Sequence, residues 1–291
     1  MTTGKATLVG FSAVLLWSLL ALFTVGTVPV PPFQLAAMAF LIGGSVGLVW
    51  IGWAGNLGAL RRVGWRVYLF GTLGLFGYHA LYFSALRIAP AAEAGLIAYL
   101  WPLLIVLFSG LLPGEQLRPL HIIGALVSFV GAAIIVLGGS SGFSADALPG
   151  FGLAFLCALT WSGYSVLSRR LGNTPTASVV VFCLLTAVLA TGAHLTWEVT
   201  AWPVDALGWA AVLGLGLGPV GLAFYVWDIG VKLGDIQLLG VASYSAPLLS
   251  TLILIVAGVA EPRLSLILAG LLITVGAVMA ARASSAQSAG N

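Results

Sequence analysis

Charged side chains are scarce in this sequence of 291 residues. Asp, Glu, Lys and Arg make up 7% of it and hydrophobic residues 60%, whereas roughly a quarter of the residues in a soluble domain are charged. This composition is typical of a chain that lies in a lipid bilayer. The net charge of +3 does not indicate nucleic-acid binding, because the 11 Lys and Arg residues are scattered and form no basic stripe.

Groups for covalent or metal chemistry are also scarce. Cys157 and Cys183 are the only cysteines. Each lies in an apolar run without a neighbouring His or Cys at ligand spacing, so we expect small buried hydrophobic residues rather than a disulfide or metal ligands. No His-Glu-x-x-His motif and no cluster of Ser, His and acid at a common depth is present. The sequence therefore predicts no enzyme, no cofactor and no metal site.

A glycine motif in the second half invites a different interpretation. Gly216, Gly218 and Gly221 spell the dinucleotide-binding pattern G-x-G-x-x-G, but that motif needs a strand before it, and these glycines lie inside an apolar run. We expect them to let a neighbouring helix pack closely, as Gly43 and Gly47 would do.

Long stretches without charge predict the membrane spans, because a helix needs about 20 apolar residues to cross the hydrocarbon. The stretch 6–60 predicts two helices, since Pro29, Pro31 and Pro32 divide it. Its first apolar run is too long for a signal peptide. Eight further stretches predict one helix each: 67–86, 94–114, 119–145, 147–168, 171–197, 206–227, 236–260 and 264–281. We expect an all-α membrane protein with ten transmembrane helices.

Basic residues predict the orientation, because they are enriched in cytoplasmic loops. If the N-terminus is cytoplasmic, Arg87 and Arg263 lie outside. The nine that lie inside are Lys5, Arg61, Arg62, Arg66, Arg118, Arg169, Arg170, Lys232 and Arg282. We therefore predict a multi-pass protein of the cytoplasmic (inner) membrane with both termini in the cytoplasm.

The sequence repeats itself after half its length. Arg87, Tyr99 and Pro102 are answered by Lys232, Tyr244 and Pro247 at a spacing of 145 residues. Five spans per half is an odd number, so the second half enters the membrane inverted. We predict two five-helix repeats, 1–145 and 146–291, around a central cavity.

Pro102 and Pro247 lie near the centres of the fourth and ninth spans. A proline removes a backbone hydrogen bond, which would leave the carbonyls of Ala98 and Ser243 without helical partners. Either the prolines make plain kinks for packing, or two broken helices face each other at a binding site and hinge there. The recurrence in both halves favours the second interpretation.

Aromatic residues divide into two groups. Those at predicted helix ends are typical of interfacial belts: Trp50, Trp53, Trp65, Trp197, Trp202 and Trp209. Those near span centres line either the predicted cavity, which we favour, or a packed core. With their polar neighbours they form the predicted substrate site: Trp17, Tyr78, His79, Tyr82, Tyr99, Trp101, Pro102, Trp161, Ser243, Tyr244 and Pro247.

Two further polar features lie inside apolar segments. His79 is either a satisfied core residue or a cavity residue. Asp228 lies one turn before Lys232, a spacing that predicts an ion pair, with a proton or substrate site as the alternative.

The motif A-P-A-A-E-A-G-L-I-A-Y-L-W-P, which ends at Pro102, has a weaker echo before Pro247. Ten spans in two inverted halves with this motif resemble the drug/metabolite transporter superfamily with its paired EamA-type domains. Within it, the residues around Trp17, His79 and Trp101 are similar to the YddG-type exporters of aromatic amino acids and of the dication paraquat. The related four-helix multidrug pumps carry a carboxylate in the first helix, where this chain has Trp17 and Ser18. Proton antiport, exchange and facilitated transport therefore all stay open.

The resemblance implies export of amino acids, aromatic and other apolar ones, by alternating access. The ammonium would bind to the Ala98 and Ser243 carbonyls and to ring faces, and the carboxylate to His79 or to indole N–H groups. The alternatives are export of another small metabolite or a cationic drug and, in another class, a polytopic membrane enzyme or lipid-handling protein. The expected partners are a small-molecule substrate and the lipid bilayer; the oligomeric state is not specified, and a monomer is compatible with the sequence.

Overall fold

The computed structural model describes residues 1–139, 142–171 and 174–288, and within these ranges the regular elements are all helical. Ten helical segments in the described residues are long and apolar enough to cross a membrane by their length and composition. They are Thr3–Gly26, Pro32–Trp53, Trp65–Ile88, Ala91–Ser109, Pro119–Val136, Ala145–Arg170, Ser178–Trp197, Ala206–Leu233, Ile236–Val256 and Ser265–Ala286. The predicted all-α class with ten transmembrane helices is confirmed.

Several of these segments consist of more than one helix. The helices of the first half are α1 (Thr3–Ser18), α2 (Leu20–Gly26), α3 (Pro32–Trp53), α4 (Leu57–Leu60), α5 (Trp65–Ile88), α6 (Ala91–Ala98), α7 (Trp101–Ser109) and α8 (Pro119–Val136). Two short 3-10 turns, η1 (Leu137–Gly139) and η2 (Ala145–Ala147), flank the connection between the halves. The second half has α9 (Leu148–Arg170), α10 (Ser178–Trp197), α11 (Ala206–Leu217), the π-helical turn η3 (Gly218–Leu222), α12 (Ala223–Leu233), α13 (Ile236–Ala242), α14 (Ser245–Val256) and α15 (Ser265–Ser288).

Some predicted span ends are wrong, because a charge was taken to end a span. Helix α6 includes Glu93, which is fully buried, and α12 runs on past Asp228 to Leu233. Buried charges are tolerated where they have partners. Asp228 is therefore not the only carboxylate within a span.

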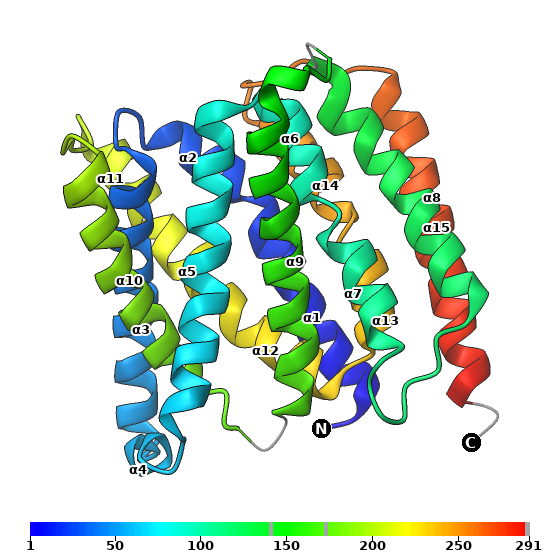
Figure 1. Cartoon of the computed structure of the whole chain (residues 1–291), viewed down its shortest axis with the longest axis horizontal. Coiled ribbons are helices and arrows are strands. Elements are labelled where there is room, and N and C mark those ends of the chain that lie inside the picture. The colour runs from blue at the N-terminus through cyan, green and yellow to red at the C-terminus, as the bar shows by residue number, and fades with distance from the viewer. Residues whose placement is uncertain (140–141, 172–173, 289–291) are drawn as a thin grey trace.

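Each span of the first half packs against a span of the second half. Helix α1 packs against α12 and α5 against α9, while α3, α7 and α8 pack against α10, α13 and α15 (Figure 1). If each span is replaced by its equivalent in the other half, the same five pairs of packed spans result. Helix α1 starts at the end of the bundle that carries both termini, whereas α9 starts at the opposite end (Figure 1).

Glycines make the closest of these contacts. A Cβ atom added at Gly43 in α3 would lie 2.6 Å from the Cα of Gly221, and one added at Gly10 in α1 would lie 2.7 Å from the Cα of Gly230. Such distances leave no room for a side chain. The interpretation of Gly221 as a packing residue is confirmed.

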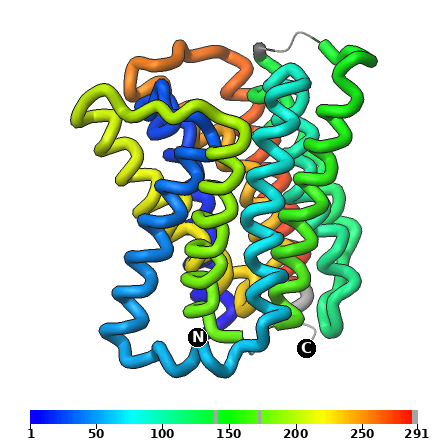
Figure 2. The backbone as a smooth tube through the Cα atoms, turned by 60° about the vertical axis from the view of Figure 1, so that its left-hand side comes forward, coloured from blue at the N-terminus to red at the C-terminus, as the bar shows by residue number. Residues whose placement is uncertain are grey.

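Helix α1 begins and helix α15 ends at the same end of the bundle in both views (Figures 1 and 2). We call this end the termini face and the other end the opposite face. The nine basic residues predicted to be cytoplasmic belong to helix ends and connections at the termini face, and Arg87 and Arg263 to the opposite face. Which face is cytoplasmic stays a prediction.

Candidate substrate site

The fourth and ninth spans are broken at equivalent places. Helix α6 ends before Tyr99 and α7 begins at Trp101, while α13 ends before Ser243 and α14 begins at Ser245. Pro102 and Pro247 lie in the first turn after each break, where a proline does not cost a helical hydrogen bond. Both prolines are buried, and their role as hinges stays a prediction.

The hydrogen bonds at these breaks differ from the prediction. The Ser243 carbonyl is not free, because it accepts from the Ala246 N–H at 3.1 Å in a tighter turn. The Leu103 N–H, whose helical partner would be the Tyr99 carbonyl, donates instead to the Tyr244 hydroxyl at 3.0 Å. Ser243 and Tyr244 are fully buried. Both residues therefore make structural contacts, and their role in the substrate site stays a prediction.

Four tryptophans meet at the centre of the bundle. The ring centroid of Trp17 lies 6.1 Å from that of Trp101, 5.7 Å from that of Trp161 and 5.0 Å from that of Trp227. They come from α1, α7, α9 and α12, so both halves contribute. Trp101, Trp161 and Trp227 are 6%, 3% and 1% exposed, which leaves little open space among them.

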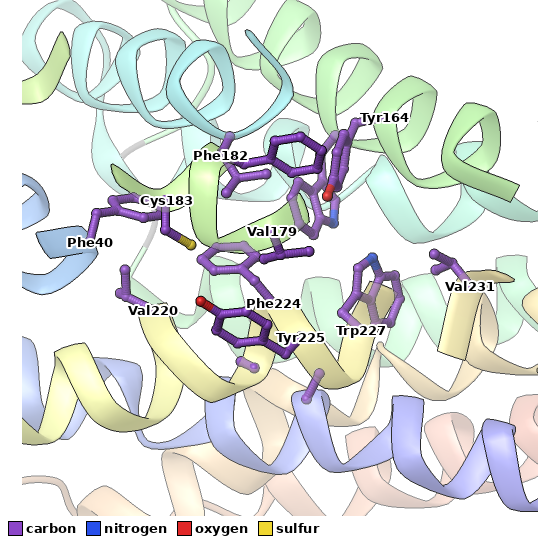
Figure 3. Packing of buried hydrophobic residues seen from close by; sticks show 14 of the residues in the cluster. Phe40, Tyr164, Val179, Phe182, Cys183, Val220, Phe224, Tyr225, Trp227 and Val231 are labelled. Carbon is purple, nitrogen blue, oxygen red and sulfur yellow. The ribbon is translucent and has the colours of Figure 1, made fainter. Parts of the chain in front are cut away.

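Trp227, Phe224 and Tyr164 were not among the predicted site residues, although they lie in the same packed region (Figure 3). The Phe224 ring lies 5.7 Å from that of Trp161, and the Tyr164 ring 5.3 Å from it. Phe224 and Trp227 are three residues apart, so they share one face of α12. This spacing in the sequence would have predicted that both side chains join the aromatic residues near the span centres.

Residues of α5 extend this aromatic group. The Tyr78 and Tyr82 rings stack at 6.1 Å with an angle of 8°, and Tyr78 lies 5.5 Å from Trp161. His79 lies 5.2 Å from Tyr78. We call the connected set the aromatic cluster: Trp17, Tyr78, His79, Tyr82, Trp101, Trp161, Phe224 and Trp227. Tyr99 packs against the hydrophobic cluster that contains Ala132, Tyr244 and Ile273.

The exposed fraction of the side chains in the aromatic cluster changes along the bundle, from the termini face to the opposite face. Tyr78, His79 and Tyr82 are half-buried and lie on α5 as it approaches the opposite face. Trp161 and Trp227 are buried and lie on helices that approach the termini face. The accessible part of the aromatic cluster therefore lies toward the opposite face.

Two of the four indole N–H groups are engaged by protein. Trp17 donates to the Pro219 carbonyl in the π-helical turn at 3.1 Å, and Trp227 donates to the Ser165 hydroxyl at 3.1 Å. The indole N–H groups of Trp101 and Trp161 have no acceptor among the described residues, and they are not among the fully buried unpaired polar atoms. They therefore keep accessible surface and are open to a ligand.

An ion pair joins the two halves at the termini face. Arg169 at the end of α9 pairs with Glu115, and its guanidinium also donates to the carbonyls of Val231 at 3.0 Å and Gly234 at 2.7 Å. These contacts tie α9 to α12 and to the segment after α7.

The predicted pair of Asp228 and Lys232 is present, with Nζ 2.8 Å from Oδ1. The Thr176 hydroxyl also donates to Asp228 at 2.7 Å, and Lys232 donates to the Thr174 carbonyl at 3.0 Å. Both charged side chains are buried, and each has several partners. This is the arrangement of a structural ion pair.

Carboxylates at the opposite face also have partners. Glu93 accepts from the Gly142 N–H at 2.7 Å. Glu198 accepts from the N–H groups of Phe33 and Gln34 at the start of α3 and pairs with Arg87 at 3.0 Å. Among the described residues no group of three or more His, Cys, Asp or Glu residues is placed to hold a metal ion. Cys157 and Cys183 are free and buried, as predicted.

Comparison with known proteins defines the family. The model of the EamA-like transporter family matches residues 4–137 and again residues 148–282. The chain belongs to the EamA-like transporter family. Both matched regions contribute side chains to the aromatic cluster, which therefore lies where the two regions pack together.

Two relatives of this EamA-like transporter have names that state a function. A protein of Ancylobacter novellus named aromatic amino acid exporter YddG is 54% identical over 96% of this chain and 98% of its own length. The protein of that name from Salmonella typhimurium is 31% identical over 86% of this chain and 88% of its own length. A crystal structure that is 53% identical matches with a TM-score of 0.92 over 96% of this chain and 98% of the other.

Proposed function

We propose that this chain exports aromatic and other apolar amino acids across the cytoplasmic membrane. The observation that carries the proposal is the aromatic cluster, which combines the half-buried rings of α5 with the unpaired indole N–H groups of Trp101 and Trp161 in the middle of the bundle. A cation over a ring gains about 0.5 to 2 kcal/mol, and an aromatic side chain stacked on a ring gains about 0.5–1.5 kcal/mol beyond burial. A zwitterion with an aromatic side chain matches these groups. The names of the relatives from Ancylobacter novellus and Salmonella typhimurium support the same substrate class.

Transport proceeds by alternating access between two inverted repeats, residues 1–145 and 146–291. Three observations support this part of the proposal. The pairs of packed helices are unchanged when the halves are exchanged, α1 and α9 start at opposite ends, and the broken spans occupy equivalent positions. Rigid-body movement of such repeats around a midplane site is the general mechanism of secondary transporters.

Both termini face the cytoplasm, in keeping with the nine basic residues at the termini face. The conformation with a closed termini face is then the outward-facing one. The substrate would leave the cell from this state, and return to the inward-facing state would break the ion pair of Arg169 with Glu115.

A cationic drug or another metabolite is the second candidate substrate. Ring faces without a carboxylate would hold an organic cation by cation–π contacts alone. The unpaired indole N–H groups favour a substrate that also carries an anionic group, since each would otherwise stay without an acceptor.

Flux measurements test the proposal. Purified protein in liposomes is expected to carry labelled phenylalanine, tyrosine and tryptophan faster than aspartate, with and without a pH gradient. Trp161→Ala is expected to reduce the flux at least tenfold, and Trp197→Ala, which removes a 61% exposed tryptophan at a helix end, is the matched control. Equal rates for the parent and Trp161→Ala would place the substrate path elsewhere. If liposomes with the protein carry phenylalanine no faster than liposomes without it, the proposed function is rejected.

A further inference from the structure

His79 has one engaged ring nitrogen. Its Nδ1 lies 2.8 Å from the carbonyl oxygen of Leu75, one turn earlier in α5. A carbonyl oxygen only accepts hydrogen bonds, so Nδ1 carries the proton. In the neutral ring the other nitrogen, Nε2, is then an acceptor with a lone pair. The helix backbone thus selects the tautomer of this histidine.

The surroundings of His79 are aromatic. Its ring lies 5.0 Å from that of Phe40, 5.9 Å from that of Phe83 and 6.3 Å from that of Phe224. Nε2 has no hydrogen-bond partner among the described residues, and it is not one of their fully buried unpaired atoms. A ligand that enters from the opposite face therefore meets the acceptor Nε2 of His79 among aromatic side chains.

The other accessible nitrogens of the aromatic cluster have the opposite character. The indole nitrogens of Trp101 and Trp161 only donate. The Trp161 ring lies 5.5 Å from that of Tyr78, which in turn lies 5.2 Å from that of His79. An acceptor and two donors are thus separated by Tyr78, a spacing that suits a ligand with a donor group and an acceptor group at different positions.

We infer that His79 recognises the α-ammonium group of the substrate through Nε2, while Trp101 and Trp161 recognise its carboxylate. The inference rests on the proposed transport of amino acids and adds the orientation of the substrate. It reverses the earlier prediction for His79, which gave this residue the carboxylate. The reason is the Leu75 carbonyl, which uses the only N–H of the neutral ring.

Substrate analogues test this orientation. Phenethylamine lacks the carboxylate of phenylalanine, and 3-phenylpropionate lacks its ammonium group. Each is offered as a competitor of labelled phenylalanine flux in liposomes that contain the parent, His79→Leu or Trp101→Phe. A hydrogen bond to a charged group corresponds to a factor of about ten or more in affinity.

The two variants are expected to respond in opposite ways. His79→Leu is expected to weaken competition by phenethylamine about tenfold and to leave competition by 3-phenylpropionate unchanged. Trp101→Phe is expected to weaken only 3-phenylpropionate. The inference is overturned if His79→Leu weakens 3-phenylpropionate instead, or weakens both analogues equally. Failure of the proposed function is distinguishable, because the parent itself would then carry no phenylalanine.

A second measurement does not depend on a substitution at His79. The chain has three histidines, so ¹⁵N-histidine NMR of the protein in lipid resolves few signals, and His121→Asn and His194→Gln remove the other two. The unprotonated nitrogen of His79 is expected to be Nε2, and phenylalanine and phenethylamine are expected to shift it. A proton on Nε2, or a shift with 3-phenylpropionate alone, contradicts the inference whether or not His79→Leu folds.

Discussion

Arg169 and Glu115 form an ion pair that joins the two halves of the chain at the termini face. The opposite face has its own ion pair between the halves, Arg87 with Glu198, but it is formed by other repeat positions. At a spacing of 146 residues Glu115 corresponds to Glu261, which is exposed, and Arg169 corresponds to Phe23, which carries no charge. The two halves therefore share an architecture without sharing the contacts that close each end.

This asymmetry predicts a preferred conformation. Arg169→Ala removes the ion pair and two hydrogen bonds to carbonyls, so it is expected to destabilise the state with a closed termini face by about 1–3 kcal/mol. Labelling of a cysteine introduced near Trp227 from the termini face is expected to rise about tenfold or more. The control is Arg170→Ala, which removes only an exposed contact to the Leu111 carbonyl. Equal labelling in both variants would contradict this role for Arg169.

Tyr244 is expected to matter for stability. Tyr244→Phe leaves the Leu103 N–H unpaired in a buried place, which costs about 1–3 kcal/mol, so the thermal midpoint in detergent falls. Tyr99→Phe is the matched control, because Tyr99 occupies the equivalent repeat position and is only half-buried. An equal or larger loss of stability in Tyr99→Phe would show that the hydroxyl of Tyr244 is not a structural cap.

Gly43 and Gly52 provide a matched pair within one helix. An added Cβ would lie 2.6 Å from the Gly221 backbone at Gly43 and would meet nothing within 4 Å at Gly52. Gly43→Ala is expected to destabilise the protein by about 1–3 kcal/mol through overpacking. Gly52→Ala is expected to be neutral or stabilising, since Ala favours helix by about 1 kcal/mol. Thermal unfolding measures both, and similar midpoints would show that α3 and η3 are free to move apart.

Asp228 is expected to act in stability more than in transport. Asp228→Asn leaves Lys232 buried without its counter-ion, and breaking a buried pair in this way costs about 3–5 kcal/mol. The amount of folded, inserted protein should fall, whereas the flux per folded molecule should keep its dependence on pH. A variant that inserts normally and loses a pH-dependent flux would assign Asp228 to coupling instead.

The orientation is a separate prediction. A reporter fused after Asn291 is expected to be read as cytoplasmic, and a single cysteine at Glu261 is expected to react with a membrane-impermeant reagent from outside. The physical reason is the retention of basic loops in the cytoplasm. A periplasmic signal from the C-terminal fusion would reverse every loop assignment and would make the closed face the outer one.

The sequence alone determined the class, the number of spans and the repeat, since burial in lipid forces about 20 apolar residues per span and leaves charges at the ends. The repeat spacing also predicted the breaks at Pro102 and Pro247, because proline limits the backbone locally. Most of the aromatic cluster was likewise predicted from aromatic residues near span centres.

Only the tertiary structure decided which polar atoms are engaged and which are accessible. Tyr99 and Tyr244 occupy equivalent positions in the repeat, yet only the Tyr244 hydroxyl accepts from the Leu103 N–H at the start of another helix. These two residues are 141 positions apart, so the local sequence does not predict their contact. The Trp17 indole likewise donates to the Pro219 carbonyl across the bundle, whereas the Trp101 indole has no acceptor among the described residues. Hydrogen bonds between distant segments depend on how helices cross, and that geometry is set by the packing of all ten spans together rather than by the local pattern of any one.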